Sequence, residues 1–494
     1  MYTFSSRLKT FSLVLIVLGI LGIGYSFLTA PKTIEDVEKI LKEEEAAHGG
    51  HHGAAAHPDA EATVHDAELT PGEGGHQHTT QELHETVPQG DHAVEHAIHD
   101  DRGHMENLEK HVTASHDAEA AHADEHHEHL EHVLHQLQNK PWSAVYVAAL
   151  FFMLLSLGAL AFYAIQNAAQ AGWSPVLFRV MEAISAYLIP GSVIVFVLLV
   201  FGVLHFHHIF IWMDEEVVAN DHLLQGKTGY LNGPFFLIRA ALFMGGWILY
   251  RQYARKNSLL QDDATDNTYY KKNFKASAGF LVFFIVTESI MSWDWIMSVD
   301  PHWYSTLFGW YVFASFFVSG ITAIAMITLY LKAKGYLEYV NTSHIHDLAK
   351  FMFGISVFWT YLWFSQFMLM WYANIPEEVT YYVTRIEEYN LPFFGMVAMN
   401  FVFPVLILIN TDFKRLSWIV VMAGIIILCG HYLDFYNMIM PATVGDRWFI
   451  GAGEIGAILL FLGLFIFVVF TALTKAPLLA KRNPLMEESK HFHY

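Results

Sequence analysis

The sequence predicts an all-α membrane protein of about ten transmembrane helices. Of its 494 residues 54% are hydrophobic, a share too high for a soluble chain of this length. The apolar residues gather in ten runs of about 20 residues, the length at which a helix crosses a bilayer. Two carboxylates, Glu288 and Asp294, lie inside one of these runs. Charge at such depth costs energy, so it usually faces the interior of a helix bundle and serves ions, protons or a polar ligand.

The ten runs also predict an orientation. Lys and Arg cluster in the short loops on the side of the amino terminus, above all between residues 251 and 275, and are rare in the opposite loops. Positively charged loops stay in the cytoplasm, so both termini are expected there. The expected spans are 8–29, 142–165, 176–204, 232–254, 276–298, 306–331, 347–372, 391–411, 416–439 and 449–474.

The first run has a rival interpretation as a cleaved signal peptide, because it follows the basic residues Arg7 and Lys9. The small residue Ala30 is followed at once by Pro31, which makes a poor cleavage junction. We therefore expect residues 1–30 to form an uncleaved first transmembrane helix.

An acidic, histidine-rich segment, residues 31–140, follows the first span. It holds 25 of the 48 Asp and Glu and 20 of the 30 His, whereas the rest of the chain is close to charge balance. We expect this segment in the periplasm, largely disordered or loosely helical, with a helix over 105–138 that could pack on a partner protein. Its composition also allows metal binding, although its histidines follow no fixed spacing.

Two motifs recur at matching places and predict an internal repeat. Trp212-Met-Asp-Glu-Glu-Val217 ends the third span and Trp371-Tyr-Ala-Asn-Ile-Pro-Glu-Glu-Val379 ends the seventh, while Asp294 and Asp434 each lie seven residues before a proline. Parallel repeats of this kind are one way to build a membrane protein. The predicted parts are a first transmembrane helix (1–30), the acidic segment (31–140), two parallel four-helix bundles (141–300 and 301–445), and a last transmembrane helix with a cytoplasmic tail (446–494).

The run Trp293-Asp-Trp-Ile-Met-Ser-Val-Asp-Pro-His-Trp-Tyr-Ser-Thr-Leu-Phe-Gly-Trp310, together with the ten spans and the repeat, resembles the integral membrane subunits of bacterial alternative complex III. That complex is a respiratory quinol:cytochrome c oxidoreductase, and its large membrane subunits are similar to the membrane subunit of polysulfide reductase. The resemblance covers about residues 142–475. The acidic, histidine-rich segment makes the chain look like the second, smaller of the two large membrane subunits, the one assigned to proton conduction.

The resemblance implies a subunit without a redox centre of its own, in a complex that passes electrons from menaquinol or another quinol to cytochrome c or a terminal oxidase. The implied partners are a multihaem cytochrome c, an iron–sulfur subunit and the paralogous membrane subunit, with haem c and iron–sulfur clusters on those partners. The residues agree, because the single cysteine, Cys429, allows neither a cysteine-ligated cluster nor a Cys-x-x-Cys-His haem attachment within this chain. Nucleic acid is not an expected partner, because no basic patch stands apart from the loops that flank the spans.

Two alternatives stay open. One is the paralogous, quinol-binding subunit of the same complex. The other is a stand-alone secondary transporter that uses its buried charges for ion-coupled uptake. Transporters tend to break helices at matching positions of their repeats, and Pro190 of the third span has no clear counterpart in the seventh, which weighs against the transporter.

A proton pathway needs buried groups that both give and take a proton. Glu288 lies near the middle of its span, Asp294 is placed nearer the outside to receive its proton, and Asp434 is the repeat equivalent of Asp294. No residue is assigned as catalytic, as a metal ligand or as binding a cofactor. The full set of candidates for the pathway is Glu288, Asp294, His431, Asp434, Glu182, Lys350, Glu454, His205, His208, Arg239, Tyr361 and Gln366.

These candidates also have structural interpretations. Arg239 could pair with an acid only to hold helices together, and His431 and Asp434, three residues apart on one helix face, could satisfy each other. A haem b held by His205 or His208 with His431 is a further alternative, although no span carries the widely spaced pair of histidines that two-haem cytochromes use.

Overall fold

The computed structural model describes residues 1–48 and 101–493. Its described part contains helices and no strand, and ten of the helices are long and apolar enough to cross a membrane. The predicted fold class, an all-α membrane protein of about ten spans, is thus confirmed. Contacts divide the chain into two compact units, Thr33–Leu134 and a membrane unit made of Met1–Lys32 with His135–Tyr494.

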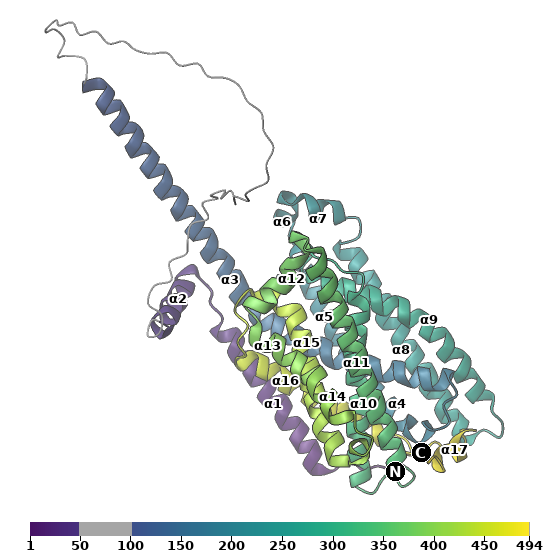
Figure 1. Cartoon of the computed structure of the whole chain (residues 1–494). Helices are drawn as coiled ribbons and strands as arrows, with labels where there is room; N and C mark the ends of the chain where they lie inside the picture. Colours follow the sequence, from purple (N-terminus) through teal and green to yellow (C-terminus); the bar gives the residue numbers. More distant parts are fainter. Residues whose placement is uncertain (49–100, 494) are drawn as a thin grey trace, which may run out of the picture. The chain divides into compact units, whose positions relative to one another are not determined.

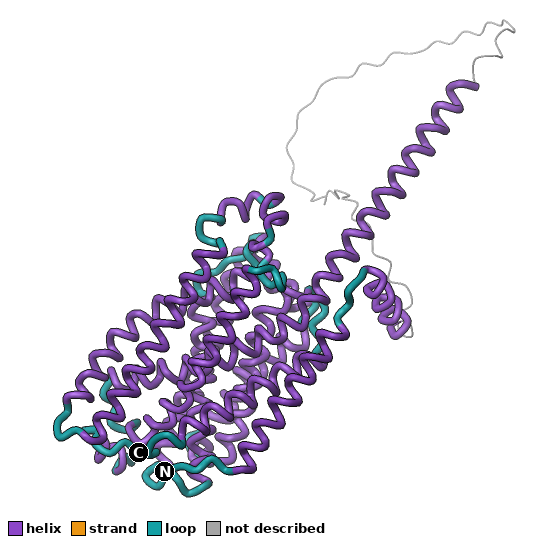
Figure 2. The backbone as a smooth tube through the Cα atoms, turned by 180° about the vertical axis from the view of Figure 1, so that it is seen from behind, coloured by secondary structure: helices purple, strands orange, loops and turns teal. Residues whose placement is uncertain are grey.

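All ten expected spans are present in the membrane unit. Helices make up almost all of this unit, and its loops gather at the two ends (Figure 2). The spans are α1 (Ser6–Thr29), the later part of α3 (Asp101–Ala168), α4 (Phe178–Ile184) with α5 (Leu188–Val203), α8 (Gly233–Asp263), α9 (Thr268–Trp295), α10 (Phe308–Ala333), α11 (Thr342–Ala373), α13 (Asn390–Val397) with α14 (Phe403–Leu408), α15 (Ser417–Val444) and α16 (Ala452–Leu473).

The helix expected over 105–138 of the acidic segment is present within the longer α3 (Asp101–Ala168), and α2 (Ile34–His48) is an additional helix that the sequence did not predict. Helix α2 follows the first span, and α3 begins at Asp101 and continues without interruption into the second span. The expected boundary between segment and bundle at 140 and 141 therefore falls inside one helix. Pro141 is accommodated there, at the loss of one backbone hydrogen bond. The histidines of residues 49–100, and with them much of the metal-binding alternative, lie outside the described residues.

We call the four spans after α1 the first bundle and the next four the second bundle, as in the expected repeat. In the first, α3 bonds α9 and α4, and α8 packs on α5 and α9; in the second, α10 packs on α11 and α15, and α13 packs on α15. Short helices occupy equivalent places on one side: α6 (Glu215–Asn220) and α7 (His222–Lys227) before α8, and α12 (Pro376–Glu387) before α13. Both chain ends lie on the other side (Figure 1), which we call the terminal side.

Two glycines let the first helices of the two bundles touch. A Cβ at Gly158 of α3 would lie 2.4 Å from the carbonyl oxygen of Phe316, and a Cβ at Gly320 of α10 would lie 2.5 Å from the backbone nitrogen of Ala159. Backbones approach this closely in membranes only where small residues meet. The contact joins the two bundles near the equivalent position of each first helix.

Replacing Gly320 by Leu is expected to lower stability by about 1–3 kcal/mol or more, because the new side chain meets backbone that cannot move aside. Gly354 of α11 is the matched control, since nothing lies within 4 Å of a Cβ built there. The measurement is the unfolding temperature of each purified variant in the same detergent. Equal unfolding temperatures for Gly320→Leu and Gly354→Leu would show that this helix crossing is not tight.

The flanking helices α1 and α16 pack on each other in the same manner. A Cβ at Gly19 would lie 2.4 Å from the backbone nitrogen of Leu460, and a Cβ at Gly456 would lie 2.8 Å from that of Ile23. Small residues along both helices thus hold α1 against α16 along its length.

Candidate functional site

Asp294, at the end of α9, is held by an arginine and a tyrosine. Arg239 of α8 donates to both of its carboxylate oxygens, at 2.6 and 3.0 Å, and the hydroxyl of Tyr230 donates at 2.8 Å. The guanidinium also lies 3.9 Å from the centre of the Tyr230 ring. Burial, and to a lesser degree the charge of Asp294, raises the pKa of Tyr230. Arg239 and Asp294 thus form an ion pair that joins α8 to α9, which was one interpretation of Arg239. A bidentate pair of this kind keeps its charges fixed.

Glu182, at the terminal side of the first bundle, is likewise paired. Its carboxylate accepts from Arg179 at 2.9 Å and from Arg255, and the hydroxyl of Tyr163 lies 3.3 Å away. Arg179 in turn donates to Asp262 at 2.6 Å. Two arginines and two acids from α4 and α8 thus form one ionic cluster, which joins the ends of these helices.

Glu288 is buried in α9, and no Lys or Arg of the described residues pairs with it. Its Oε1 accepts from the hydroxyl of Ser289 at 2.8 Å, and its Oε2 has no hydrogen-bond partner among the described residues. Only 2% of the residue is exposed. A carboxyl in such surroundings is suited to exchanging a proton, because burial disfavours its charged form and only one hydroxyl donates to it among the described residues.

Asp434 occupies the equivalent place in the second bundle but has different partners. It accepts from the hydroxyl of Tyr311 and, at 2.8 Å, from Nε1 of Trp359. Nδ1 of His431 lies 3.7 Å from Asp434 and 2.9 Å from the hydroxyl of Ser315. Both Asp434 and His431 are completely buried, and within the described residues neither Lys nor Arg pairs with Asp434. Nε2 of His431 has no partner in the same part of the chain.

Buried hydroxyls follow this centre along α10 toward the terminal side, with Ser315, Ser319 and Thr322 on one face of the helix and Thr328 on another. Ser315, Ser319, Thr322 and Thr328 are all fully buried, as is Ser356 on the neighbouring α11. The hydroxyls of Thr322, Thr328 and Ser356 have no hydrogen-bond partner among the residues described. Buried hydroxyls of this kind are normally satisfied by internal water, so those on the shared face of α10 are suited to a chain of water and hydroxyl groups.

An irregular turn brings an amide to the same region. The eighth span forms a π-helical stretch over Ala398–Val402, and Pro404, which has no N–H, cannot bond the carbonyl of Asn400 four residues earlier. The side chain of Asn400 lies against Gly430, where a Cβ would come within 2.1 Å of its Oδ1. Gly430, the residue before His431, therefore makes room for the completely buried side-chain amide of Asn400.

The remaining candidates do not join these centres. Glu454 caps its own helix by accepting from the backbone of Gly451 at 2.8 Å, with Lys140 4.0 Å from its other oxygen. Gln366 is buried in α11, and neither amide atom has a partner in the described chain. The structure leaves Lys350, Tyr361, His205 and His208 exposed.

The histidines proposed for a haem lie in different surroundings. His431 is inside the second bundle, whereas His205 and His208 are exposed in the loop after α5. The buried histidine of that loop is His207, whose Nε2 lies 2.9 Å from the carbonyl of Leu198 and whose pKa is lowered by burial. Among the described residues, no three His, Cys, Asp or Glu side chains gather in a way that could hold a metal ion.

Several residues of these centres were not predicted. Tyr230, Tyr311 and Trp359 bind the two equivalent aspartates, yet a tyrosine or tryptophan in an apolar helix is indistinguishable from ordinary packing in a sequence. Asn400 carried a readable signal, because an amide followed four residues later by proline is unusual inside a span.

Comparison with known proteins adds no assignment: no family model matches the chain, and no curated protein shows significant similarity to it. The fold and its buried groups define a multi-pass helical membrane protein with two kinds of intramembrane acid. Asp294 and Glu182 are fixed by arginine, while Glu288 and the Asp434–His431 centre have no such cation among the described residues.

Proposed function

We propose that this protein conducts protons through its second bundle. The observation that carries the proposal is the completely buried Asp434–His431 centre, which is bonded by Tyr311, Trp359 and Ser315 and has no Lys or Arg partner in the described chain. Carboxyl, imidazole and hydroxyl groups can each give and take a proton, and intramembrane acids and histidines often form relays.

The pathway continues from the centre in both directions. Toward the terminal side the hydroxyls on one face of α10 follow, from Ser315 to Thr322, a length of about 10 Å at the rise of an α-helix. Toward the opposite side lies Tyr381 of α12. Burial raises the pKa of Tyr381, the neighbouring Arg385 lowers it, and the charge of Asp434 raises it to a lesser degree.

We further propose, from the resemblance, that the chain is an integral subunit of a respiratory quinol-oxidising complex in a bacterial inner membrane, with its terminal side in the cytoplasm. The chain has one cysteine, Cys429, which is exposed on α15. One cysteine cannot hold an iron–sulfur cluster, so proton conduction beside separate redox subunits suits this chain. Haem c and iron–sulfur clusters belong to the proposed partner subunits, and menaquinol or another quinol is the proposed substrate of the whole complex.

A pocket on the first bundle supports the quinol-binding alternative. It has a volume of about 520 Å³, lies opposite the terminal side, and is lined by aromatic residues that include Tyr230, Trp293 and Trp303. An aromatic pocket of this size suits a ring-shaped ligand. Tyr230 also bonds Asp294, so a buried carboxylate with its arginine lies next to this pocket.

The transporter alternative gains less support. The spans interrupted by irregular turns are the third, between α4 and α5, and the eighth, between α13 and α14. These are the second helix of one bundle and the third helix of the other, whereas inverted or parallel repeats of transporters break at matching positions.

Purification of the protein from its native membrane in mild detergent tests the proposal. We expect haem-containing and iron–sulfur proteins to copurify with it, and quinol oxidation by the reconstituted complex to release protons across the membrane. Isolation of the chain alone, with no haem protein attached, would contradict its place in a respiratory complex. Quinol oxidation without proton release would contradict proton conduction.

A further inference from the structure

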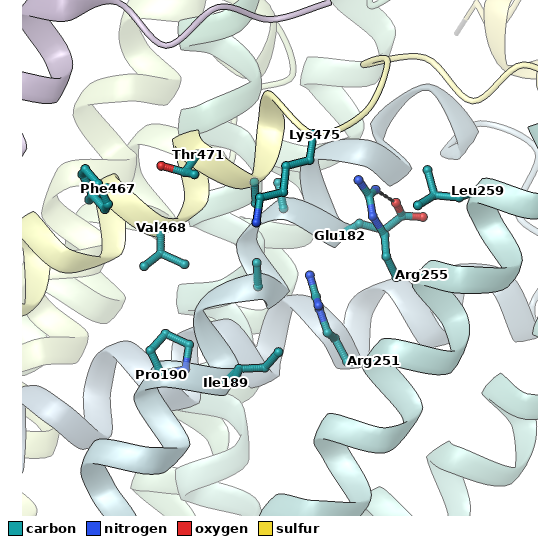
Figure 3. Close-up of a pocket in the computed structure, with 13 residues that line it drawn as sticks. Glu182, Ile189, Pro190, Arg251, Arg255, Leu259, Phe467, Val468, Thr471 and Lys475 are labelled. Atoms are coloured by element: carbon teal, nitrogen blue, oxygen red, sulfur yellow. Dashed lines mark hydrogen bonds and ion pairs between the residues drawn. The ribbon is translucent and has the colours of Figure 1, made fainter.

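A groove on the terminal side of the membrane unit combines positive charges with an apolar wall. It has a volume of about 480 Å³ and is bounded by α4 and α5, by the end of α8 and by the end of α16. Figure 3 shows the amine of Lys475 and the guanidinium of Arg251 pointing toward one another across it. Phe467, Val468 and Pro190 lie on the other side of the same space (Figure 3).

The charges of the groove are not balanced from within. The one acid in its wall, Glu182, is already bonded to Arg179 and Arg255. Arg251 and Lys475 form no ion pair with any described residue, and the Nε of Arg251 is buried without an acceptor in the described chain. Burying an arginine nitrogen without an acceptor costs free energy, so the groove is built to receive a negative group from outside the protein.

The apolar wall lies deeper in the membrane than the charges. Val468 precedes Lys475 by seven residues, about 10 Å along a helix, and Ile189 and Pro190 lie beyond the paired Glu182 in the direction of the opposite side. Arg251 lies within the last four residues of the expected span 232–254 and Lys475 follows the end of α16, so both lie near the membrane surface on the terminal side. Charge at the surface and apolar side chains beneath it match the shape of a phospholipid.

We propose that this groove binds an anionic phospholipid, whose phosphate lies between Arg251 and Lys475 and whose acyl chains lie along Ile189, Pro190 and Val468. Basic pockets between transmembrane helices on the inner side of a membrane are known to hold such headgroups. A free phosphate would satisfy the cations but would leave the apolar wall uncovered. The bound lipid would join α16 to the first bundle, because its contacts come from α5, α8 and α16.

The test compares lipid binding by the purified, delipidated protein and by the double variant Arg251→Gln, Lys475→Gln. We expect phosphatidylglycerol to raise the unfolding temperature of the parent protein and to remain attached in native mass spectrometry, whereas phosphatidylcholine does neither. Each surface cation contributes about 1 kcal/mol to attraction of an anionic lipid, so the double variant is expected to bind phosphatidylglycerol about tenfold or more weakly. The matched control, Lys256→Gln, Lys275→Gln, removes two exposed charges from the same side outside the groove and should bind as the parent does.

Two further measurements separate binding of a whole phospholipid from binding of a phosphate group alone. Val468→Trp fills the apolar half of the groove without changing its charges, and should weaken phosphatidylglycerol binding while the protein stays folded. Inorganic phosphate at the same concentration should raise the unfolding temperature little. An equal rise with inorganic phosphate would show a simple anion site, equal rises with both lipids would show no headgroup selectivity, and unchanged lipid binding by the double variant would place the lipid elsewhere; each result would overturn the proposal.

Discussion

Replacing Asp434 by Asn is expected to abolish most proton conduction while the protein remains folded. The amide has nearly the same size, and its oxygen can still accept from Trp359 or Tyr311, so the bundle keeps its packing. An amide cannot take up and release a proton near neutral pH. Loss of a positioned acid or base typically slows proton transfer by about a hundredfold or more. The measurement is proton flux into proteoliposomes, driven by a potassium diffusion potential and followed by a pH-sensitive dye inside them.

The control for this variant is Asp446→Asn. Asp446 follows the same helix, α15, but 68% of its side chain is exposed, and it carries the same charge. Its replacement should leave the flux unchanged. A normal flux in Asp434→Asn, combined with a reduced flux in Glu288→Gln, would move the pathway to the first bundle, where Glu288 has an oxygen without a partner among the described residues.

The sequence predicted the spans well because a bilayer imposes a simple rule on length and polarity. Each of the ten runs formed a helical span, and α6 and α12 begin within the two motifs of the expected repeat. Length and polarity do not place the boundary that we predicted at residue 140, between the acidic segment and the first bundle. Charged and apolar stretches can follow each other within one helix, as they do in α3, when the two stretches meet different solvents.

The site was predicted in part. The motif pointed to Asp294 and Asp434 as equivalent residues, and both are completely buried. Their partners come from other helices, Arg239 in one case and Tyr311 with Trp359 in the other. Neither pairing follows from spacing along the chain, because it depends on how the helices are rotated in each bundle.

The exposed candidates failed to join the site for the same reason. Tyr361 and Gln366 lie five residues apart on α11, close to one and a half turns, so they face different ways. Gln366 is buried, whereas 66% of Tyr361 is exposed. A sequence shows that both lie in a span but does not show which face of the helix meets the bundle.

Replacing Arg239 by Gln is expected to be the most destabilising single change in the first bundle. It would leave the carboxylate of Asp294, which is completely buried, with Tyr230 as its remaining donor. Removing one partner of a buried ion pair typically costs about 3–5 kcal/mol, because the other charge stays buried without compensation. The measurement is the unfolding temperature and the yield of folded protein in detergent.

A second substitution separates this cause from simple loss of packing. In the double variant Arg239→Gln, Asp294→Asn the uncompensated charge is gone, and most of the lost stability should return. Arg239→Lys keeps the charge but replaces the two-pronged contact by a single point of attachment, so it should be intermediate. If the double variant is as unstable as Arg239→Gln, the cost comes from the packing of Arg239 against Tyr230 and Phe235 rather than from its charge.

The two equivalent aspartates should therefore respond in opposite ways to the same substitution. Asp294→Asn leaves Arg239 buried without its carboxylate and should lower stability, whereas proton flux per folded molecule stays close to normal. Asp434→Asn removes no ion pair with Lys or Arg in the described chain and should lower flux while stability changes little. An asymmetry of this kind would show that the repeat has kept one acid as a fixed charge and uses the other to carry protons. Equal losses of stability in both variants would instead make both aspartates structural and would remove the main support for proton conduction through the second bundle.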